Sequence, residues 1–417
     1  MCYEIVGENE INGEVEVETS KNALLPIMAA SVLASDKVVI NNVPNFSDVI
    51  VMCDILKDLG ASVVLKNRKL IIDPRTINKT EISEELSQKL RASIFLMGPI
   101  LSKFKKVTAY MPGGCKIGKR PIDIHLQGFE ELGIKTHIEN NKILCDAQCF
   151  CGGKIYLRKP SVGATENLIM CAVLFKNRIT TIENCAKEPE IVDLCNFLTK
   201  LGAKIYGAGT EKIVVVGVEK LGGTTYTPIG DRIIAGTYMI AVAMCKGKLT
   251  IKNANIDYNK SLISILSNLG CIIEGDSDNI YITMDNSCSG NINISTGPYP
   301  GFPTDLQSQM VSLLCVTNGM HTVEENLFEN RFNQIPWLIK MGANIKVNNN
   351  VATICGKEKC LNSSIVEAQD LRGGAALVLA ALAAKGKSKI LNTEYIDRGY
   401  ENLDIKLSNI GADIQRT

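Results

Sequence analysis

The sequence has almost no surplus of charge of either sign, and this excludes one large class of function. Its 45 Lys and Arg residues are balanced by 44 Asp and Glu residues, which gives a formal net charge of +1. A protein that binds duplex nucleic acid usually carries a marked excess of positive charge on one face. The balance therefore argues against nucleic acid as the main partner, although a few local cations suffice for a small anionic ligand.

Long hydrophobic runs are also absent. The two longest near-apolar runs, residues 23–34 and 373–384, have 12 residues each, which is too short to span a bilayer. The N-terminal residues lack the basic and then apolar profile of a secretory signal. Fifteen cysteines are spread over the 417 residues. We interpret them as reduced thiols of a soluble cytoplasmic protein with no membrane insertion.

Familiar metal-binding and nucleotide-binding patterns are missing as well. Cys145, Cys149 and Cys151 form the tightest cysteine group, but no second cysteine pair accompanies them. The three histidines stand at no spacing that is typical of a metal site. The sequence contains no phosphate-binding loop of the G-x-x-x-x-G-K-[ST] type. We therefore expect no metal site and no phosphate loop of that type.

One tripeptide, an apolar residue, a glycine and a small or apolar residue, recurs along the whole chain. Its six glycines, at intervals of 68 to 73 residues, are Gly60, Gly133, Gly202, Gly270, Gly342 and Gly411. Each follows an amphipathic run of helical period and fits a left-handed helix C-cap. Two short β-like stretches follow each glycine. The regular spacing indicates internal repeats of roughly 70 residues.

A second helix of small apolar residues precedes each amphipathic run. These six segments are residues 23–34, 92–101, 164–175, 233–245, 306–316 and 373–384. Because they are apolar on nearly every side, they are predicted to be interior helices, with the strands and the amphipathic helices outside them. A solenoid is the alternative, but its repeats are usually shorter and simpler. The pattern predicts an α/β chain of six helix–strand–helix–strand–strand units.

Polar residues mark the starts of the six predicted interior helices. They are Lys21-Asn22, Arg91, Ser161-Val162-Gly163, Asp231-Arg232, Thr304-Asp305 and Asp370-Leu371-Arg372. Ser, Thr, Asn and Asp have an ordinary explanation as N-caps, whereas a cation at a helix start opposes the helix dipole. If the helices point the same way, these starts converge into a site for phosphates and carboxylates.

Residues 112–123 combine three glycines with three cations around one cysteine. Lys116, Lys119 and Arg120 surround Cys115 with positive charge, which favours the thiolate form. The glycines allow such a loop to approach a ligand closely. We therefore predict that Cys115 is the reactive cysteine and that the other fourteen are inert.

Taken together, these residues resemble the enolpyruvyl transferases over essentially the whole chain. The motifs that carry the resemblance are residues 20–23, 91–93, 112–115, 120–125, 161–165, 188–193, 302–305, 328–332, 370–372 and 396–401. The cysteine loop and residues 159–163 are similar to the branch of the family that acts on a sugar nucleotide. The shikimate-pathway branch shares the fold but lacks both features.

The resemblance implies an inside-out α/β barrel with two domains, each built from three repeat units. The interior helices would point at the cleft between the domains, which would hold the active site. The first domain would span residues 20–229 and carry the Cys115 loop. The second would span residues 1–19 and 230–417 and carry Asp305 and Arg398.

The resemblance also implies a reaction. The enolpyruvyl group of phosphoenolpyruvate would move to the 3′-hydroxyl of UDP-N-acetylglucosamine with release of phosphate, the first committed step of peptidoglycan synthesis. No metal or redox cofactor would take part. Addition and elimination through a tetrahedral intermediate require a general acid and a general base. By resemblance, Cys115 is the acid, Asp305 is the base, and Lys21 and Arg398 complete the catalytic group.

The remaining site residues are assigned to the two substrates by the same resemblance. Phosphoenolpyruvate would be held by Lys21, Asn22, Arg120 and Arg398. UDP-N-acetylglucosamine would be held by Arg91, Arg120, Pro121, Ile122, Asp123, Ile124, Lys159, Pro160, Ser161, Val162, Gly163, Asp305, Leu327, Arg331 and Arg372. Leu327 stands where the family often has a smaller β-branched residue, and the cysteine loop is more basic than usual. A cysteine at position 115 implies sensitivity to fosfomycin-type epoxides.

Two other functions stay open from the sequence. One is enolpyruvyl transfer to shikimate 3-phosphate, which would need no uridine pocket. The other is a catalytically silent sensor of sugar nucleotides, against which the intact set of Lys21, Cys115, Asp305 and Arg398 argues. Phosphate release from phosphoenolpyruvate that depends on UDP-N-acetylglucosamine distinguishes these alternatives.

Overall fold

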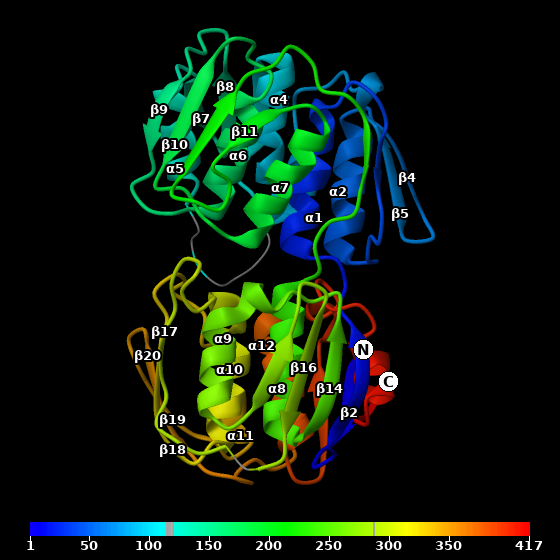
Figure 1. Cartoon of the computed structure of the whole chain (residues 1–417), viewed down its shortest axis with the longest axis vertical. Coiled ribbons are helices and arrows are strands. Elements are labelled where there is room, and N and C mark those ends of the chain that lie inside the picture. The colour runs from blue at the N-terminus through cyan, green and yellow to red at the C-terminus, as the bar shows by residue number, and fades with distance from the viewer. Residues whose placement is uncertain (114–117, 119–120, 287) are drawn as a thin grey trace. The chain divides into compact units, whose positions relative to one another are not determined.

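The computed structural model describes residues 1–113, 118, 121–286 and 288–417. The chain divides into two compact units, whose elements are labelled in Figure 1. Unit 1 contains Met1–Glu18 and Gly230–Thr417, and unit 2 contains nearly all of the described residues from 19 to 229. The predicted reactive Cys115 and its neighbours Lys116, Lys119 and Arg120 lie outside the described residues.

Unit 2 combines three sheets with three largely buried inner helices. The inner helices are α1 (Lys21–Ala30), α4 (Met97–Phe104) and α6 (Val162–Ala172). The other helices are α2 (Ser47–Asp58), α3 (Glu84–Lys89), α5 (Asp123–Glu131) and α7 (Pro189–Lys200). The strands are β3 (Val38–Ile40), β4 (Ser62–Lys66), β5 (Lys69–Asp73), β6 (Lys106–Tyr110), β7 (Lys135–Glu139), β8 (Lys142–Asp146), β9 (Gly153–Tyr156), β10 (Ile179–Glu183), β11 (Lys204–Tyr206), β12 (Lys212–Val216) and β13 (Thr224–Tyr226). Their orders in the sheets are β13–β3–β5–β4, β6–β8–β7 and β11–β12–β10–β9.

Unit 1 likewise combines three sheets with three inner helices. Its inner helices are α8 (Arg232–Cys245), α10 (Thr304–Val316) and α12 (Leu371–Ala383). The other helices are α9 (Lys260–Asn268), α11 (Ile335–Lys340) and α13 (Leu403–Asn409). The strands are β1 (Cys2–Val6), β2 (Ile11–Glu16), β14 (Gly247–Lys252), β15 (Ile272–Gly275), β16 (Asn279–Met284), β17 (Asn293–Ser295), β18 (Gly319–Glu324), β19 (Asn344–Asn348), β20 (Val351–Gly356), β21 (Ile365–Glu367), β22 (Lys387–Leu391) and β23 (Asp413–Arg416). Their orders are β15–β16–β14–β2, β17–β18–β20–β19 and β21–β22–β1–β23.

The six glycines that set the sequence period share one backbone conformation. All have positive φ angles, between 82° and 108°, in the left-handed region where a side chain is strained. Each glycine therefore ends an amphipathic helix as a C-cap, as the sequence predicts. The order helix, strand, helix and hairpin recurs along the chain. In the last sheet β1 lies between β22 and β23, where the other sheets have the second strand of a hairpin.

The apolar helices are buried on all sides, as the sequence predicts. All residues from Arg232 to Ala243 in α8 and from Arg372 to Leu382 in α12 are buried. In unit 1, α8, α10 and α12 pack against one another, and Figure 1 shows them side by side. Their N-terminal turns carry the polar residues that the sequence singles out, so this packing positions the candidate site.

One predicted interior helix, over residues 92–101, is only partly α-helical. Arg91–Leu96 forms a 3-10 helix, and α4 begins at Met97. The amide of Gly98 donates to Oδ1 of the buried Asn167 at 2.8 Å, and Pro99 has no amide hydrogen to donate. A regular α-helix through this point would need both amides to bond to backbone carbonyls one turn earlier. The predicted helix is therefore present, but it is divided into a 3-10 segment and an α-helix.

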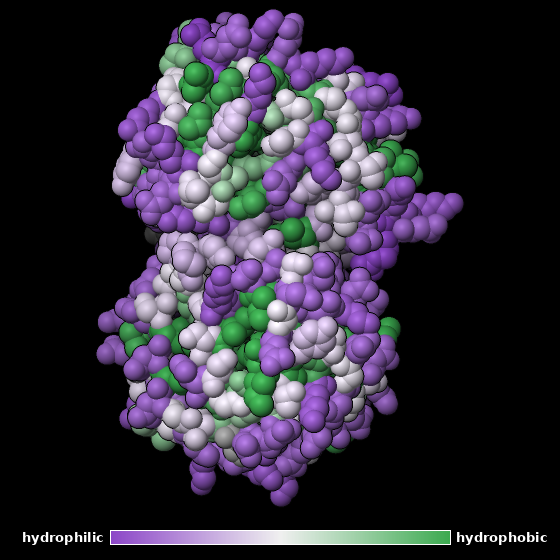
Figure 2. Space-filling model, viewed as in Figure 1, coloured by the Kyte–Doolittle hydropathy of each residue, from purple (hydrophilic) through white to green (hydrophobic). Residues whose placement is uncertain are grey.

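Hydrophilic side chains cover most of the visible face of each unit in Figure 2. None of the described helices has the length and apolar content that crossing a membrane requires. The 14 described cysteines are free thiols. Burial raises the pKa of Cys145 to about 12 and that of Cys53 to about 11, which keeps these thiols protonated and poorly nucleophilic. In the described ranges, no group of three or more His, Cys, Asp or Glu residues is arranged to hold a metal ion.

Candidate active site

The starts of the three inner helices of unit 1 meet, as expected for helices that point the same way. Asp305 in the first turn of α10 lies against Arg372 in the first turn of α12, with Oδ2 and Nη2 3.0 Å apart. The hydroxyl of Tyr400 lies 2.8 Å from Oγ1 of Thr237 in α8 and accepts from Nε2 of Gln309 in α10 at 3.3 Å. These contacts join all three helices near their N-termini.

Asp305 is held by two buried guanidinium groups. Nη2 of Arg331 lies 2.6 Å from Oδ1, and Nη2 of Arg372 binds Oδ2 on the other side. The two arginine side chains are 2% and 4% exposed, whereas that of Asp305 is 27% exposed. Charge-assisted hydrogen bonds of this kind are short and directional. The carboxylate is therefore fixed in place and still accessible to a ligand.

The guanidinium of Arg372 stays positively charged and has one unused hydrogen-bond donor within the described part of the chain. Burial by itself lowers the pKa of this guanidinium, but Asp305, Tyr400 and Asp231 raise it, and the net pKa lies above the usual value. Its Nη1 has no hydrogen-bond partner among the described residues. A buried donor without a partner costs free energy. A carboxylate or phosphate of a ligand is the kind of group that satisfies such a donor.

The polar residues at the helix starts of unit 1 divide into two kinds. Asp231 caps α8 by accepting from the amides of Ile233 and Ile234, and Asp370 caps α12 in the same way. The N-cap explanation is therefore correct for these two residues. Thr304 is the first residue of α10 and not its cap, because the N-cap position is taken by Pro303. Its hydroxyl donates to Oε2 of Glu325 at 2.9 Å.

The corresponding segments of unit 2 are neighbours as well. Helix α1 contacts the 3-10 helix Arg91–Leu96, which also contacts α6. Lys21, the first residue of α1, places Nζ 2.7 Å from Oδ2 of Asp48 in α2. Both side chains are largely buried. A buried cation at a helix start requires a counter-charge. Asp48 supplies it for Lys21 in unit 2, and Asp305 supplies it for Arg372 in unit 1. Carboxylates of the protein therefore partly neutralise the cations predicted at the helix starts.

The predicted sugar-nucleotide segment of unit 2 is fixed at the start of α6. Oγ of Ser161 accepts from the amide of Ala164 at 3.4 Å. Gly163 lies against the ring of His125, where a Cβ would approach Cε1 to 3.2 Å. Nδ1 of His125 is 3.0 Å from Nδ2 of the buried Asn167. The segment is therefore anchored to both α5 and α6, and glycine at position 163 avoids crowding that ring.

The other predicted residues differ in how much of their side chains they expose. The residues of intermediate exposure are Lys21, Asn22, Arg91, Pro160, Ser161, Val162, Gly163, Asp305 and Arg398. Pro121, Asp123, Lys159 and Leu327 are exposed. Asp123 forms an ion pair with Arg158. Ile122 and Ile124 are buried, so their side chains are not accessible to a ligand. The predictions for Cys115 and Arg120 concern residues outside the described ranges.

The sequence motifs did not indicate two buried glutamates, Glu325 and Glu166. Glu325 is 3% exposed. Its carboxylate accepts hydrogen bonds from the hydroxyl of Thr304 at the start of α10 and from the backbone amide of Leu327. Glu166 is fully buried in α6, and burial, then Glu190 and Glu188, raise its pKa well above the usual value. A glutamate next to a strand, or within an apolar helix, carries no motif that reveals its burial. Only the three-dimensional packing identifies these residues.

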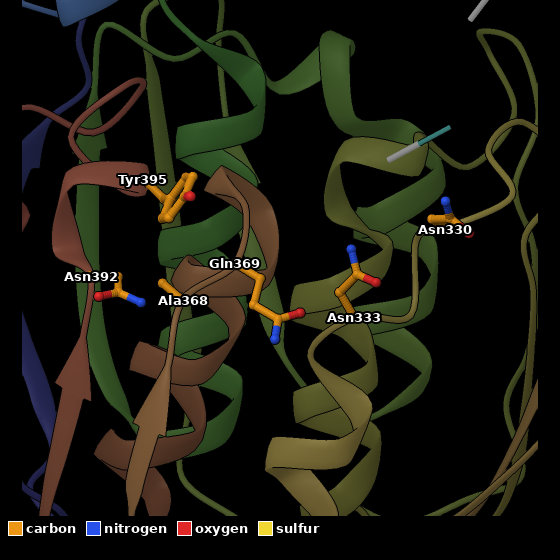
Figure 3. Close-up of a pocket in the computed structure, with 6 residues that line it drawn as sticks. All are labelled: Asn330, Asn333, Ala368, Gln369, Asn392 and Tyr395. Atoms are coloured by element: carbon orange, nitrogen blue, oxygen red, sulfur yellow. The ribbon is translucent and has the colours of Figure 1, made fainter. Parts of the chain in front are cut away.

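Figure 3 shows a cavity of about 380 Å³ in unit 1. It is lined by Asn330, Asn333, Ala368, Gln369, Asn392 and Tyr395. Four of these six side chains are carboxamides and none is charged, so the cavity offers hydrogen bonds but no cation for a phosphate. The buried cations next to Asp305 in unit 1 are instead Arg331 and Arg372.

Asp193 of α7 is expected to make the stability of the protein depend on pH. Its carboxylate accepts from the hydroxyl of Tyr226 at 2.6 Å and from the amide of Ile229 at 3.2 Å. Burial raises its pKa from 3.8 to about 6. The folded state therefore binds this proton more tightly than the unfolded state. The resulting stability is present below about pH 4 and is lost as the pH rises to about 6, up to about 3 kcal/mol.

The measurement is thermal unfolding of the wild type and of Asp193→Asn between pH 4 and pH 7. We expect the stability of the wild type relative to Asp193→Asn to fall as the pH rises through this window. The comparison with the variant is needed because Glu166 and Glu18, whose pKa values are also raised by burial, add dependence of the same sign. Parallel pH curves for the two proteins would contradict the prediction.

Comparison with known proteins identifies the family of this chain. Residues 5–407 match the family model of EPSP synthase (3-phosphoshikimate 1-carboxyvinyltransferase). A UDP-N-acetylglucosamine 1-carboxyvinyltransferase 2 of Caldanaerobacter subterraneus subsp. tengcongensis is 46% identical over 414 residues, covering 99% of each chain. A UDP-N-acetylglucosamine 1-carboxyvinyltransferase of Finegoldia magna is 44% identical over 410 residues, covering 97% of this chain and 96% of the relative.

Solved structures give the same fold. The enolpyruvyl transferase NikO from Streptomyces tendae superposes with a TM-score of 0.88 at 23% identity, covering 99% of this chain and 98% of that one. This likeness confirms the predicted mixed α/β fold class. The length of the family match and the identity to the two relatives also confirm the resemblance found in the sequence. The chain belongs to the EPSP synthase family, in the branch of the UDP-N-acetylglucosamine 1-carboxyvinyltransferases.

Proposed function

We propose that the chain transfers the enolpyruvyl group of phosphoenolpyruvate to the 3′-hydroxyl of UDP-N-acetylglucosamine and releases phosphate. This reaction would be the first committed step of peptidoglycan synthesis, carried out in the cytoplasm. The observation that carries the proposal is the Asp305 carboxylate, fixed by Arg331 and Arg372 and still accessible. The names of the two relatives of this chain supply the identity of the acceptor, UDP-N-acetylglucosamine.

We also propose that each unit is an inside-out α/β barrel of three repeat units. The domains would span residues 20–229, and residues 1–19 together with 230–417. Three observations support this architecture: the recurring element order, the six glycines with positive φ, and the three sheets in each unit. The burial of α8 and α12 on all sides agrees with their place inside such a barrel.

The proposed chemistry is an addition followed by an elimination. Cys115 donates a proton to C3 of phosphoenolpyruvate while the sugar 3′-oxygen forms a bond to C2 and passes its proton to Asp305. The product of this step is a tetrahedral intermediate with a methyl group at C3. The Cys115 thiolate left by the first step then takes a proton from that methyl group, and the C–H electrons form the double bond between C2 and C3. The bond from C2 to the phosphate oxygen breaks, and phosphate leaves. A positioned acid and base each contribute on the order of 10²–10⁴-fold to such a rate.

Substrate binding is proposed to divide between two groups of residues. Phosphoenolpyruvate is held by Lys21, Asn22, Arg120 and Arg398. UDP-N-acetylglucosamine is held by Arg91, Arg120, Pro121, Ile122, Asp123, Ile124, Lys159, Pro160, Ser161, Val162, Gly163, Asp305, Leu327, Arg331 and Arg372. Arg331 and Arg372 have a second task, since both position the carboxylate of Asp305.

Phosphate release from phosphoenolpyruvate tests this function. The purified chain is assayed with UDP-N-acetylglucosamine, with shikimate 3-phosphate and with no acceptor. We expect stoichiometric phosphate only with UDP-N-acetylglucosamine. Release only with shikimate 3-phosphate would replace the proposal by the shikimate-pathway reaction. No release under any condition would favour a catalytically silent protein that binds sugar nucleotides.

Modification by a fosfomycin-type epoxide provides an independent prediction for Cys115. The thiolate sulfur forms a bond to an epoxide carbon and the carbon–oxygen bond opens, so that the whole mass of the reagent is added. We expect one adduct per chain in the wild type and none in Cys115→Ser. Cys355→Ser, which removes an exposed thiol, serves as the matched control and should keep the adduct. Intact-mass spectra without an adduct at Cys115 in the wild type would count against the assignment.

A further inference from the structure

We propose that Glu325 is a positioning residue that couples the turn carrying the base Asp305 to the turn carrying Leu327. The inference rests on the proposed function, because Asp305 and Leu327 are proposed there to act on the acceptor. Glu325 follows β18 directly and touches neither substrate in this proposal. It acts through the hydrogen bonds that its carboxylate accepts from both turns.

The carboxylate of Glu325 accepts four hydrogen bonds from three segments. Oε2 accepts from the hydroxyl of Thr304 at 2.9 Å. Oε1 accepts from the hydroxyl of Thr296 at 3.0 Å and from the amides of Leu327 and Phe328 at 2.8 and 3.2 Å. Three of these four bonds converge on Oε1, and the fourth ties Oε2 to the start of α10. Because Glu325 is 3% exposed, solvent does not compete for these contacts.

The bond from Thr304 reaches the base through the first turn of α10. Thr304 immediately precedes Asp305, and Pro303 before it supplies no side-chain cap to the helix. The backbone carbonyl of Thr304 also accepts from Nε and Nη2 of Arg331, at 3.4 and 3.3 Å. The same Nη2 binds Oδ1 of Asp305. Glu325 and Arg331 therefore hold this turn from opposite ends, one at the hydroxyl and the other at the carbonyl.

The bonds to Leu327 and Phe328 give Glu325 its second task. They fix a tight turn only two and three residues along the chain. Leu327 is exposed at this turn and is proposed to contact the sugar nucleotide. The guanidinium of Arg331 also lies 5.8 Å from the centre of the Phe328 ring. One buried carboxylate thus sets the position of an acceptor-binding turn relative to the base within unit 1.

Steady-state kinetics of three variants test this coupling. Thr304→Val cuts only the bond toward Asp305, so kcat should fall about 10-fold or more while KM for UDP-N-acetylglucosamine stays the same. Glu325→Ala cuts both links, so kcat should fall about 10²-fold, the loss expected from a displacement of about 1 Å at a reacting group, and KM should rise. Thr304→Ser keeps the hydroxyl and should restore wild-type kcat. Melting temperatures are measured for every variant.

Glu325→Gln is a milder variant in case the alanine variant does not fold. Its amide oxygen can face the two backbone amides, while its NH₂ group faces the Thr304 hydroxyl, which can turn to accept. We expect the KM of the wild type with a reduced kcat. Glu324→Gln is the matched control, because this neighbour bonds only to Ser295 Oγ at a surface position among the described residues. It should have wild-type kinetics.

The outcomes separate this inference from the proposed function. If the wild-type enzyme is active and kcat is unchanged in Thr304→Val and Glu325→Gln, the role of Glu325 is overturned and the proposed function stands. Equal losses in Thr304→Ser and Thr304→Val would also overturn it, since the hydroxyl would then be irrelevant. A fall in melting temperature with unchanged kcat would show a purely structural role. An inactive wild type would overturn the proposed function and this inference together.

Discussion

Asp305→Asn is expected to lower kcat by about 10²–10⁴-fold, the usual contribution of a positioned general base. The amide keeps the size of the side chain and can still accept a hydrogen bond from Arg331 or Arg372. It cannot take the proton of the 3′-hydroxyl. The affinity for UDP-N-acetylglucosamine, measured by calorimetry, should change far less than kcat does. A kcat within a few-fold of the wild type would remove Asp305 from the mechanism.

The same substitution should also reduce stability, which requires a control. It removes a negative charge from between two buried guanidinium groups, and breaking such a buried pair typically costs about 3–5 kcal/mol. The double variant Asp305→Asn/Arg372→Met removes one positive charge as well. We expect it to regain part of the lost melting temperature without regaining activity. Recovery of activity together with stability would show that the loss was structural.

Lys21→Met is expected to produce the second largest loss, about 10²–10³-fold in kcat/KM for phosphoenolpyruvate. The substitution keeps most of the apolar stem but removes the ammonium group proposed to bind the substrate's phosphate or carboxylate. One preorganised donor at a developing charge is worth about this factor. Initial rates over a range of phosphoenolpyruvate concentrations measure the effect. KM for UDP-N-acetylglucosamine should stay close to that of the wild type.

The ion pair of Lys21 with Asp48 supplies the matched control. Nζ and Oδ2 are 2.7 Å apart and both side chains are largely buried, so Lys21→Met also takes away a partner of Asp48. The double variant Lys21→Met/Asp48→Asn restores the charge balance. We expect its melting temperature to exceed that of Lys21→Met while its activity stays low. A fully active double variant would contradict a direct role of Lys21 in binding.

Much of the fold is predictable from the sequence because glycine and helix periodicity act locally. A glycine such as Gly202 marks a left-handed C-cap wherever a helix must end abruptly, and its φ of 107° agrees. The uniformly apolar run in α12 predicts a helix buried on all sides, and the structure confirms it. Residues 92–101 show the limit of prediction from local sequence, because this segment is part 3-10 helix and part α-helix. The contact of Gly98 with Asn167, 69 positions away, is a tertiary one and cannot be found from local pattern.

The candidate site shows the same division. The convergence of Thr304-Asp305 with Arg372 follows from the common direction of the inner helices and is confirmed. The sequence predicts that the cations at the helix starts bind an anionic ligand. In the structure, Lys21 and Arg372 are already paired with carboxylates of the protein itself. Burial of a charge requires a partner, but which carboxylate supplies it depends on packing between distant segments. Glu325 escaped prediction for the same reason.

The product formed in heavy water tests the central claim most directly. The chain is incubated in D₂O with phosphoenolpyruvate and UDP-N-acetylglucosamine, and the products are analysed by mass spectrometry and NMR. We predict one phosphate for each molecule of UDP-N-acetylglucosamine that gains an enolpyruvyl ether at its 3′-oxygen. Deuterium should appear at the vinyl carbon, because addition makes a methyl group there before elimination. Absence of the ether, or an ether without deuterium, would contradict the proposed transfer through a tetrahedral intermediate.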